Sequence, residues 1–460
     1  MRVEKDFLGQ VEVPDDAYYG VFTVRAAKNF NLTNMRARPV FIHMLGRIKQ
    51  SAAQVHLDLG QMPPEKANAI EQAAREVAEG KFDNEFPLDV IQAGAGTPFN
   101  MNSNEVIANR ALEILGKPRG NYSIIHPNND VNKSQSSNDV IPTAIRLAVL
   151  HEHPKLSSAA AAFEASLFQK AKQYSHVVQT GRTHLQDAVP LTLEQFFSAF
   201  AIAIKNDRLA LDAATSRLGE LGIGGTAIGT GINTHPKFRE LMVKKLAENT
   251  HLALTSGISP VELTSNMNAF LPYAQAMNQL ATTLHRIAND LKLLSSGPRA
   301  GIGEFRLPEV EPGSSIMPGK INPSIAEAAE MAALQAMSHI YAVELGCRGG
   351  QLQLNVLTPL ISHNILSAQE LLTNTCGMFR TFCIDGIVVD ETRTHEALMS
   401  GLIVATALAP KLGYDKVSEL IKEADKRRLP IKEVIAEKKL FTKEELDKLL
   451  DPAKMTGPAE

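Results

Sequence analysis

One stretch, residues 270–294, constrains the fold more than any other part of the chain. A 3.5-residue repeat of apolar side chains runs through it for more than three heptads. The repeat comprises Phe270, Ala274, Met277, Leu280, Leu284, Ile287, Leu291 and Leu294. Such a repeat is typical of a long helix that packs against other helices. Pro272 suits the first turn of this helix, and Gly297–Pro298 ends it.

Three further stretches predict long helices of the same kind. Residues 191–218, 324–345 and 365–387 are rich in Ala, Leu and Met and are apolar on nearly every face. A helix that is apolar on several faces needs other helices on several sides. We therefore expect a mainly α protein with a central helical bundle that other subunits complete.

The composition changes twice along the chain. Residues 1–135 combine shorter helical patterns with turn-rich segments, whereas the long helical patterns lie within residues 136–390. Residues 391–460 are rich in Lys and Glu and predict short, solvated helices. The sequence thus predicts an N-terminal mixed helical domain, a central long-helix domain and a small C-terminal helical domain with these boundaries.

Composition and charge argue against several classes of protein. The formal net charge is −3 and Trp is absent, which disfavours binding to nucleic acid or to anionic membranes. Cys347, Cys376 and Cys383 lack CxxC spacing, so we expect buried thiols without a disulfide or a zinc site. The chain has no apolar signal segment at its start and no apolar run of about eighteen residues. These features predict a soluble, cytoplasmic protein.

Four polar stretches interrupt the helical pattern. They are GAGTPFNMNSNE (94–105), SQSSND (134–139), GRTHLQD (181–187) and GSSIMPGKINP (313–323). Hydroxyls, amides and glycine-exposed backbone with few carboxylates suit the binding of a small anion. Lys320 would supply the charge. Hydrogen bonds would come from Thr97, Ser136, Ser137, Asn138, Thr183 and Asn322.

Each of these residues also has a purely structural interpretation, which the residues alone leave open. Asn322–Pro323 forms a good start for a helix, and residues 136–138 suit the cap of a helix that begins near Asp139. His184 taken alone is typical of a structural histidine, and Lys320 of a solvated charge.

Two other features do not indicate a site. GIGGTAIGTG (222–231) contains G-x-G-x-x-A, but we predict no strand before it and find no acidic ribose partner after it, which disfavours a dinucleotide site. His151 and His153 lack a metal-ligand context, and we expect both on the surface.

The four stretches together resemble the aspartase/fumarase superfamily. GSSIMPGKIN matches its signature loop, GSSxMPxKxN, and the other three stretches match its remaining regions in order and spacing. The resemblance implies a mainly α, three-domain fold whose central bundle is shared across a homotetramer, with each active site drawing on three chains. It also implies cleavage of a C–N or C–O bond beside a carboxylate to release fumarate, without a cofactor or metal.

The resemblance also implies the roles of individual residues. Ser314 is the implied catalytic base, on a mobile loop whose N–H groups and Lys320 would stabilise its oxyanion. His184 and Glu327 are an implied pair in the same site. Implied contacts to a dicarboxylate substrate are Thr97, Ser136, Ser137, Asn138, Thr183, Ser315, Lys320 and Asn322. Four further residues resemble a second anion site seen in fumarases. They are His126, Asn128, Asn129 and Asp130.

The leaving group is less clearly indicated. GQLQLNV (350–356), AGAGT (93–97) and SSGPRAG (295–301) resemble aspartases, whereas HPNNDVNKSQSSND (126–139) and GYDK (413–416) resemble class II fumarases. Pro98–Phe99 fits neither group, because a small polar residue usually follows the threonine. We favour aspartate as the substrate, with fumarate hydration as the alternative. A catalytically dead structural relative is disfavoured because the chain retains Ser314, Lys320, Asn322, Thr183 and His184 together.

Overall fold

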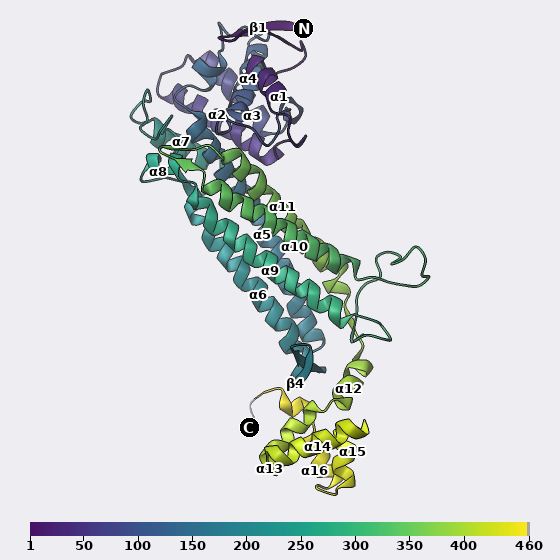
Figure 1. Ribbon diagram of the computed structural model, residues 1–460. Coiled ribbons are helices and arrows are strands. Elements are labelled where there is room, and N and C mark those ends of the chain that lie inside the picture. Colours follow the sequence, from purple (N-terminus) through teal and green to yellow (C-terminus); the bar gives the residue numbers. More distant parts are fainter. Residues whose placement is uncertain (458–460) are drawn as a thin grey trace. The chain divides into compact units, whose positions relative to one another are not determined.

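The computed structural model describes residues 1–457, and helices dominate it (Figure 1). The α-helices are α1 Val21–Asn29, α2 Pro39–Asp58, α3 Pro64–Ala78, α4 Thr97–Ile114, α5 Ser137–Gln173, α6 Leu193–Ala214, α7 Phe238–Thr250, α8 Pro260–Ser265, α9 Leu271–Leu294, α10 Ser324–Cys347, α11 Thr358–Phe382, α12 Glu391–Ser400, α13 Ala409–Leu412, α14 Tyr414–Arg427, α15 Ile431–Glu437 and α16 Lys443–Leu449. The prediction of a mainly α chain is confirmed.

The strands are short and pair locally. They are β1 Arg2–Asp6, β2 Gly9–Val13, β3 Val178–Thr183, β4 Gln186–Thr192, β5 Glu220–Leu221, β6 Thr255–Ser256, β7 Phe305–Arg306, β8 Gly350–Gln351, β9 Leu354–Asn355 and β10 Val388–Val389. The pairs β1–β2, β3–β4, β7–β10 and β8–β9 are antiparallel, and β5–β6 is parallel. The core therefore comes from the packing of helices.

The chain forms two compact units. The first comprises residues 1–157, 209–281 and 335–373, and the second comprises residues 158–208, 282–334 and those from 374 onward. The predicted three-domain division stays a prediction. Its two internal boundaries fall next to the start of α5 at Ser137 and the start of α12 at Glu391.

The helix predicted from the heptad repeat is α9, and this prediction is confirmed. Each repeat position from Phe270 to Leu291 is fully buried, and Leu294 is 6% exposed. Pro272 is the second residue of the helix, where its missing N–H removes no intrahelical bond. The heptad positions therefore form a buried face of α9.

The other long helices form with shifted ends. α6 and α10 fall close to the predicted ranges, but α11 starts at Thr358 and stops at Phe382, several residues earlier than predicted at both ends. Pro359 at the second position of α11 provides its start, and the 3-10 turn Ile384–Gly386 follows its end. Apolar periodicity identified these helices but not their capping residues.

The long helices α5, α6, α9, α10 and α11 run side by side (Figure 1). In the first unit, the Tyr273 hydroxyl on α9 accepts from Gln369 Nε2 on α11 at 2.9 Å. In the second, Thr283 Oγ1 on α9 donates to Asp207 on α6, and Lys292 pairs with Glu330 on α10. Polar bonds thus join neighbouring helices whose apolar faces form the core.

His153 is not the surface residue that the sequence predicts. Its side chain on α5 is largely buried, with Nε2 3.0 Å from Asp212 Oδ1 and Nδ1 3.1 Å from the Tyr273 hydroxyl. Burial lowers the pKa of His153, and the Asp212 carboxylate opposes this effect. The prediction failed because only the helix packing shows which face of α5 lies inward. His151 is exposed as predicted.

The glycine-rich stretch 222–231 packs tightly against its neighbours. A two-residue strand, β5, does precede it, so the prediction of no strand there was wrong in detail. Gly224 has a φ of +84°, and a Cβ on Gly229 would lie 2.3 Å from the Val261 nitrogen. The glycines are needed for backbone geometry and for close approach to α8.

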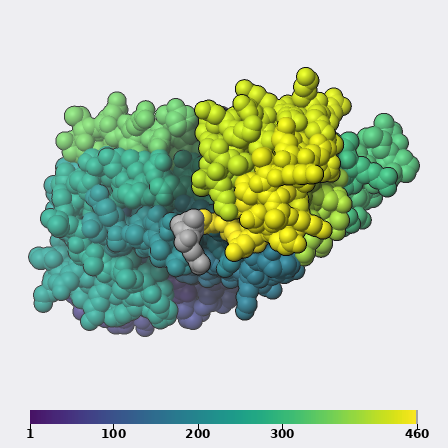
Figure 2. Space-filling model, turned by 90° about the horizontal axis from the view of Figure 1, so that it is seen from below, coloured from purple at the N-terminus to yellow at the C-terminus, as the bar shows by residue number. Residues whose placement is uncertain are grey.

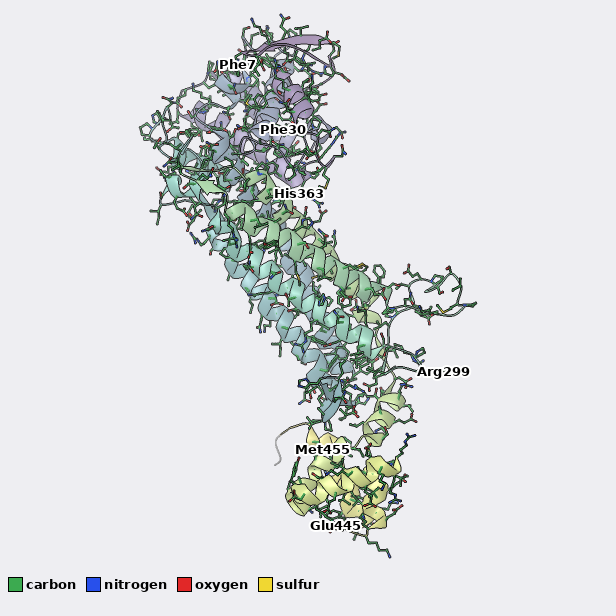
Figure 3. The ribbon with its side chains drawn as sticks, in the orientation of Figure 1. Phe7, Phe30, Arg299, His363, Glu445 and Met455 are labelled. Carbon is green, nitrogen blue, oxygen red and sulfur yellow. The ribbon has the colours of Figure 1, made fainter. Side chains whose placement is uncertain are left out.

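The C-terminal segment contains the predicted short helices around a small apolar core. α14 and α15 contribute Val417, Leu420, Ile431 and Val434 to this core. Thr442 and Glu445, which is labelled in Figure 3, form a capping box at the start of α16. The space-filling view shows this segment, in yellow, as a rounded lobe (Figure 2).

The cysteines are buried and unpaired, as predicted. Burial raises the pKa of the Cys376 and Cys383 thiols to about 12, which makes them poor nucleophiles at neutral pH. No helix among residues 1–457 is long and apolar enough to cross a membrane.

Candidate active site

The signature loop lies between β7 and α10, and Figure 1 shows it extending away from the helix ends as an irregular segment. A backbone hydrogen bond from Gly313 N–H to Lys320 O, 2.8 Å long, closes its base. Within it, Ser314 Oγ accepts hydrogen bonds from the N–H groups of Ile316 at 3.2 Å and Met317 at 3.0 Å. Two backbone donors thus converge on one serine oxygen, the arrangement that stabilises an oxyanion.

The other loop residues are placed around this serine turn. Asn322 donates from Nδ2 to Gly313 O at 2.8 Å and so ties the end of the loop to its start. Ser315 and Lys320 are exposed, and so is the apolar Ile316 at 82%. The loop therefore presents a cation and hydroxyls to whatever faces it.

Thr183 and His184 lie at the tip of the β3–β4 hairpin. His184 and Leu185 form its two-residue turn, with φ values of +55° and +58°. Positive φ at both positions is the geometry of a type I′ turn, which suits the twist of a hairpin. Arg182, one residue earlier, pairs with the fully buried Glu304. The hairpin is thereby anchored while Thr183 and His184 remain exposed.

The implied pair of His184 and Glu327 is not formed within one chain. Both side chains are exposed, and the ion pairs among residues 1–457 include neither of them. The pair therefore stays a prediction.

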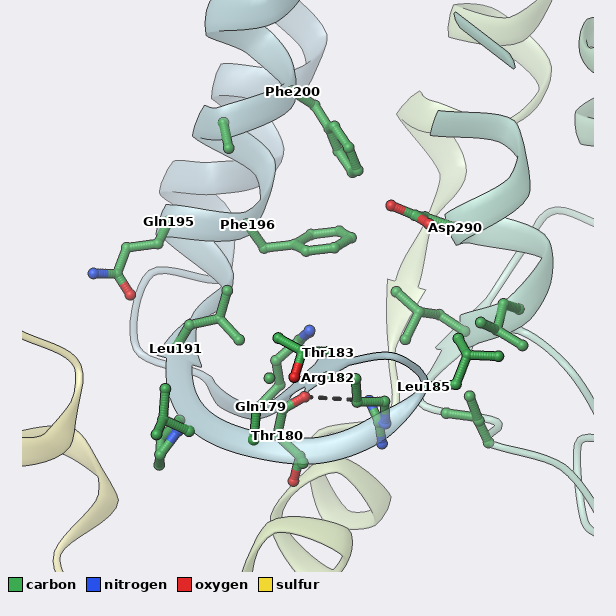
Figure 4. Close-up of a pocket in the computed structure, with 18 of the residues that line it drawn as sticks. Gln179, Thr180, Arg182, Thr183, Leu185, Leu191, Gln195, Phe196, Phe200 and Asp290 are labelled. Atoms are coloured by element: carbon green, nitrogen blue, oxygen red, sulfur yellow. Dashed lines mark hydrogen bonds between the residues drawn. The ribbon is translucent and has the colours of Figure 1, made fainter. Parts of the chain in front are cut away.

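A pocket of about 420 Å³ lies beside the hairpin. Figure 4 shows Phe196 and Phe200 of α6 on one side and Asp290 of α9 on the other, with Thr183 below them. Burial raises the pKa of Asp290, and Arg286 opposes this effect. Most of the lining is apolar, which suits a packed side chain better than a dianion.

Two of the polar stretches meet in the first unit, at Asn100 and Ser137. Thr97 starts α4 and donates from Oγ1 to Gly94 O at 2.7 Å. One turn later, Asn100 donates from Nδ2 to Ser137 Oγ at 3.0 Å, which links α4 to the first residue of α5. Asn138 donates from Nδ2 to Ala227 O at 2.7 Å. The structure thus joins two of the four polar stretches that the sequence singled out.

Ser136 caps α5, as its structural interpretation predicted. Its Oγ accepts from Asn138 N–H at 3.2 Å, while its own N–H donates to Asp139 Oδ1 at 2.9 Å. Asp139 Oδ2 also accepts from the N–H groups of Gly224 and Thr226. Burial raises the pKa of Asp139 to about 6, and these backbone donors oppose it. The start of α5 is therefore tied to the glycine-rich segment.

Sequence analysis missed a buried lysine beneath these residues. Lys49 on α2 is fully buried, and its Nζ donates to Asn100 Oδ1 at 2.7 Å, Asn132 Oδ1 at 2.9 Å and Gln135 Oε1 at 3.0 Å. Burial lowers the pKa of Lys49 to about 7, and the Asp139 charge opposes this shift. The signal available in the sequence was a cation next to the apolar Ile48 within a helical pattern.

His126, Asn128, Asn129 and Asp130 form one compact turn at Pro127–Val131. His126 Nδ1 accepts from the N–H groups of Asn128 and Asn129, and His126 N–H donates to Asp130 Oδ2 at 2.8 Å. Asp130 also pairs with Lys66 at 3.0 Å. The two asparagine side chains are exposed.

Pro98 and Phe99, which fit neither subfamily, belong to the core of the first unit. Phe99 is 3% exposed, and its ring packs edge-on against Phe41 with centroids 5.4 Å apart. Pro98 is the second residue of α4. The unusual pair therefore packs behind Thr97 as apolar structure.

The fold is built on long helices, and its signature loop contains both a lysine and a serine whose oxygen accepts from two backbone amides. Together these features define a lyase of the helical-bundle class. The family profile described as "Lyase" matches residues 9–338, and the profile described as "Fumarase C C-terminus" matches residues 404–457. The chain belongs to the aspartase/fumarase superfamily.

Relatives with two different activities are similarly close. An aspartate ammonia-lyase of Helicobacter pylori is 41% identical, with 100% of this chain and 98% of the relative covered. A class II fumarate hydratase of Photorhabdus laumondii is 42% identical, with 99% and 98% covered. The crystal structure of fumarate lyase:delta crystallin from Brucella melitensis bound to cobalt matches with a TM-score of 0.96 and 42% identity, covering 99% of this chain and 100% of that one.

Proposed function

We propose that this protein is an aspartate ammonia-lyase, which eliminates ammonia from L-aspartate to give fumarate. The observation that supports the elimination chemistry is the serine turn, in which the N–H groups of Ile316 and Met317 both donate to Ser314 Oγ. Support for aspartate comes from the aspartase-like stretches GQLQLNV, AGAGT and SSGPRAG, and from relatives named aspartate ammonia-lyase.

In the proposed reaction the Ser314 alkoxide takes a proton from the carbon next to the side-chain carboxylate of aspartate. The electron pair of that C–H bond moves into the carboxylate and forms an aci-carboxylate. The pair then returns to form the C=C bond as the C–N bond breaks. The amino group leaves as ammonia, so the products are fumarate, ammonia and the proton held by Ser314.

The loop has the groups that this charge movement requires. Two backbone donors stabilise the alkoxide before the proton is taken, and the exposed Lys320 ammonium can pair with the carboxylate on which charge develops. Because Asn322 donates to Gly313 O, it closes the loop in this state. Its direct contact with substrate, like that of Ser315, is part of the proposal.

The remaining implied residues would hold the substrate. Their hydroxyl, amide and imidazole groups can donate to the two carboxylates of the substrate or accept from its ammonium group. These residues are Thr97, Ser136, Ser137, Asn138, Thr183 and His184. Asn128 and Asn129 would bind an anion at a second, peripheral site, together with His126 and Asp130.

Assembly into a homotetramer is part of the same proposal. Along α10, Met331, Tyr341 and Leu345 are 63%, 58% and 41% exposed, and on α6 Ile202 and Leu209 are both 49% exposed. Large apolar side chains on long helices are typical of a surface that another helix covers. A shared bundle would cover them and bring active-site stretches of three chains together.

Class II fumarase is the second candidate. The stretch HPNNDVNKSQSSND resembles fumarases, and the fumarate hydratase of Photorhabdus laumondii is as similar to this chain as the aspartases are. The same base and the same loop would serve either reaction. Hydroxide, unlike an ammonium group, must gain a proton as it leaves, so a general acid would be needed.

One experiment separates the candidates. Purified protein is given L-aspartate or L-malate, and fumarate is followed by its ultraviolet absorbance while released ammonia is assayed. The proposal expects fumarate and ammonia in equal amounts from L-aspartate, and formation of aspartate from fumarate with ammonium. Turnover of malate without turnover of aspartate would establish the fumarase instead.

A further inference from the structure

The side chain of Lys49 has no exposed surface and no carboxylate partner within hydrogen-bonding distance among the described residues. Its three contacts are all side-chain amide oxygens, those of Asn100, Asn132 and Gln135. In its protonated form Nζ carries three donors and no acceptor, so each of the three amides then turns its oxygen toward Nζ. Lys49 therefore removes the ambiguity that ordinarily surrounds the orientation of a side-chain amide.

The consequence for Asn100 is that its nitrogen must point away from Lys49. Both hydrogens of Nδ2 have acceptors there, Asn132 Oδ1 at 3.1 Å and Ser137 Oγ at 3.0 Å. Asn132 Oδ1 accepts from Lys49 as well, and Asn132 Nδ2 donates to Gln135 O at 3.3 Å. The bond from Lys49 thus determines the direction of both hydrogen bonds that Asn100 Nδ2 makes.

The next residue in this chain of hydrogen bonds is Ser137, the first residue of α5. Since Ser137 Oγ accepts from Asn100, its own hydroxyl hydrogen is left for another acceptor. Among residues 1–457, this bond from Asn100 is the only hydrogen bond of Ser137 Oγ. Ser137 is 9% exposed.

We propose that Lys49 is a positioning residue that, through Asn100, makes Ser137 a hydrogen-bond donor to a carboxylate of the substrate. The inference rests on the proposed function, because it takes Ser137 as a residue of the dicarboxylate site. It adds a buried cation on α2 that determines the polarity of the hydroxyl without touching the substrate.

The first test substitutes Lys49→Met, which keeps much of the chain volume and removes all three donors. The affinity for succinate, a dicarboxylate that cannot react, is measured by titration calorimetry alongside steady-state kinetics. We expect binding to weaken by about 10- to 100-fold, the range for a lost hydrogen bond to a charged group, with KM affected more than kcat. Lys170→Met is the matched control: Lys170 is another buried lysine, bonded to Gln173 Oε1 and Ile387 O.

The decisive test is a double-mutant cycle with Ser137→Ala. If Lys49 acts through this hydroxyl, the double variant binds succinate within about threefold of Ser137→Ala alone, because the second change has nothing left to remove. Losses that multiply would mean that Lys49 acts independently of Ser137 and would overturn the inference. Unchanged binding in Lys49→Met, or an equal loss in Lys170→Met, would overturn it as well.

Asn100→Asp keeps the inference testable if Lys49→Met does not fold. This change is nearly isosteric and gives Lys49 a carboxylate partner, but residue 100 then has only acceptors and would take the hydroxyl hydrogen of Ser137. We expect succinate binding to weaken as in Ser137→Ala, with no further loss when the two are combined. Normal binding in Asn100→Asp would overturn the inference, and a further loss on combination would show charge repulsion instead.

Failure of the proposed function gives a different result from failure of this inference. If the wild-type protein binds succinate but releases no ammonia from aspartate, the proposal of an ammonia-lyase fails. The double-mutant cycle can still be evaluated in that case, because it is measured by the affinity for succinate. If the wild-type protein binds no dicarboxylate, both fail together.

Discussion

Replacing Ser314 by alanine tests the chemistry most directly. The substitution removes one oxygen from an exposed loop, so we expect no loss of fold. Ser314 Oγ accepts hydrogen bonds from two backbone N–H groups, whose nitrogens lie 3.2 and 3.0 Å from it. At about 3 kcal/mol for each preorganised donor, they would stabilise an alkoxide by about 6 kcal/mol, or roughly 10⁴-fold in its population. A base with this support contributes to the transition state far more than to binding.

We therefore expect Ser314→Ala to lower kcat by about 10³- to 10⁴-fold while KM changes by less than about threefold. Initial rates of fumarate formation from L-aspartate measure both constants. Ser265→Ala is a matched control, because Ser265 on α8 is, like Ser314, a partly buried serine, and its Oγ donates to Val261 O. A variant that keeps a near-normal kcat, or that raises KM alone, would remove Ser314 from the role of base.

Three further predictions concern stability and assembly. Burial raises the pKa of Asp139 above its unfolded value of 3.8 to about 6, so its stabilising contribution is present below pH 4 and is lost as pH rises through 6. The stability of the wild type relative to Asp139→Asn should then fall by about 1 kcal/mol between pH 5 and pH 7 in denaturant titrations, and a constant difference would contradict this. Leu284→Asp buries an unpaired carboxylate in the core around α9 at a cost of roughly several kcal/mol, so denaturant titrations should show a large loss of stability and activity should fall with it; a variant as stable as the wild type would contradict the prediction. Inactive Ser314→Ala and Thr183→Val proteins, mixed and reassembled, should regain part of the activity if the two residues reach one site from different chains, whereas hybrids that stay inactive would place both in one chain.

Much of the fold could be predicted because its signals are local. The heptad repeat of residues 270–294 determines both the length of α9 and the face that is buried. The signature loop is likewise contiguous, so its serine, lysine and asparagine could be named from the sequence. The same local signals missed both ends of α11. The helix begins at Thr358–Pro359 and ends at Phe382, where a turn follows.

Only the tertiary structure decided what surrounds those motifs. Lys49 and Gln135 are separated by 86 positions along the chain, and no periodicity marks a bond between them. The sequence could not show that Phe99 packs on Phe41, or that His153 faces Asp212 and not solvent. The physical reason is the same in each case: helix formation depends on neighbours three and four residues away, whereas the burial and direction of a polar group depend on which helices pack against it.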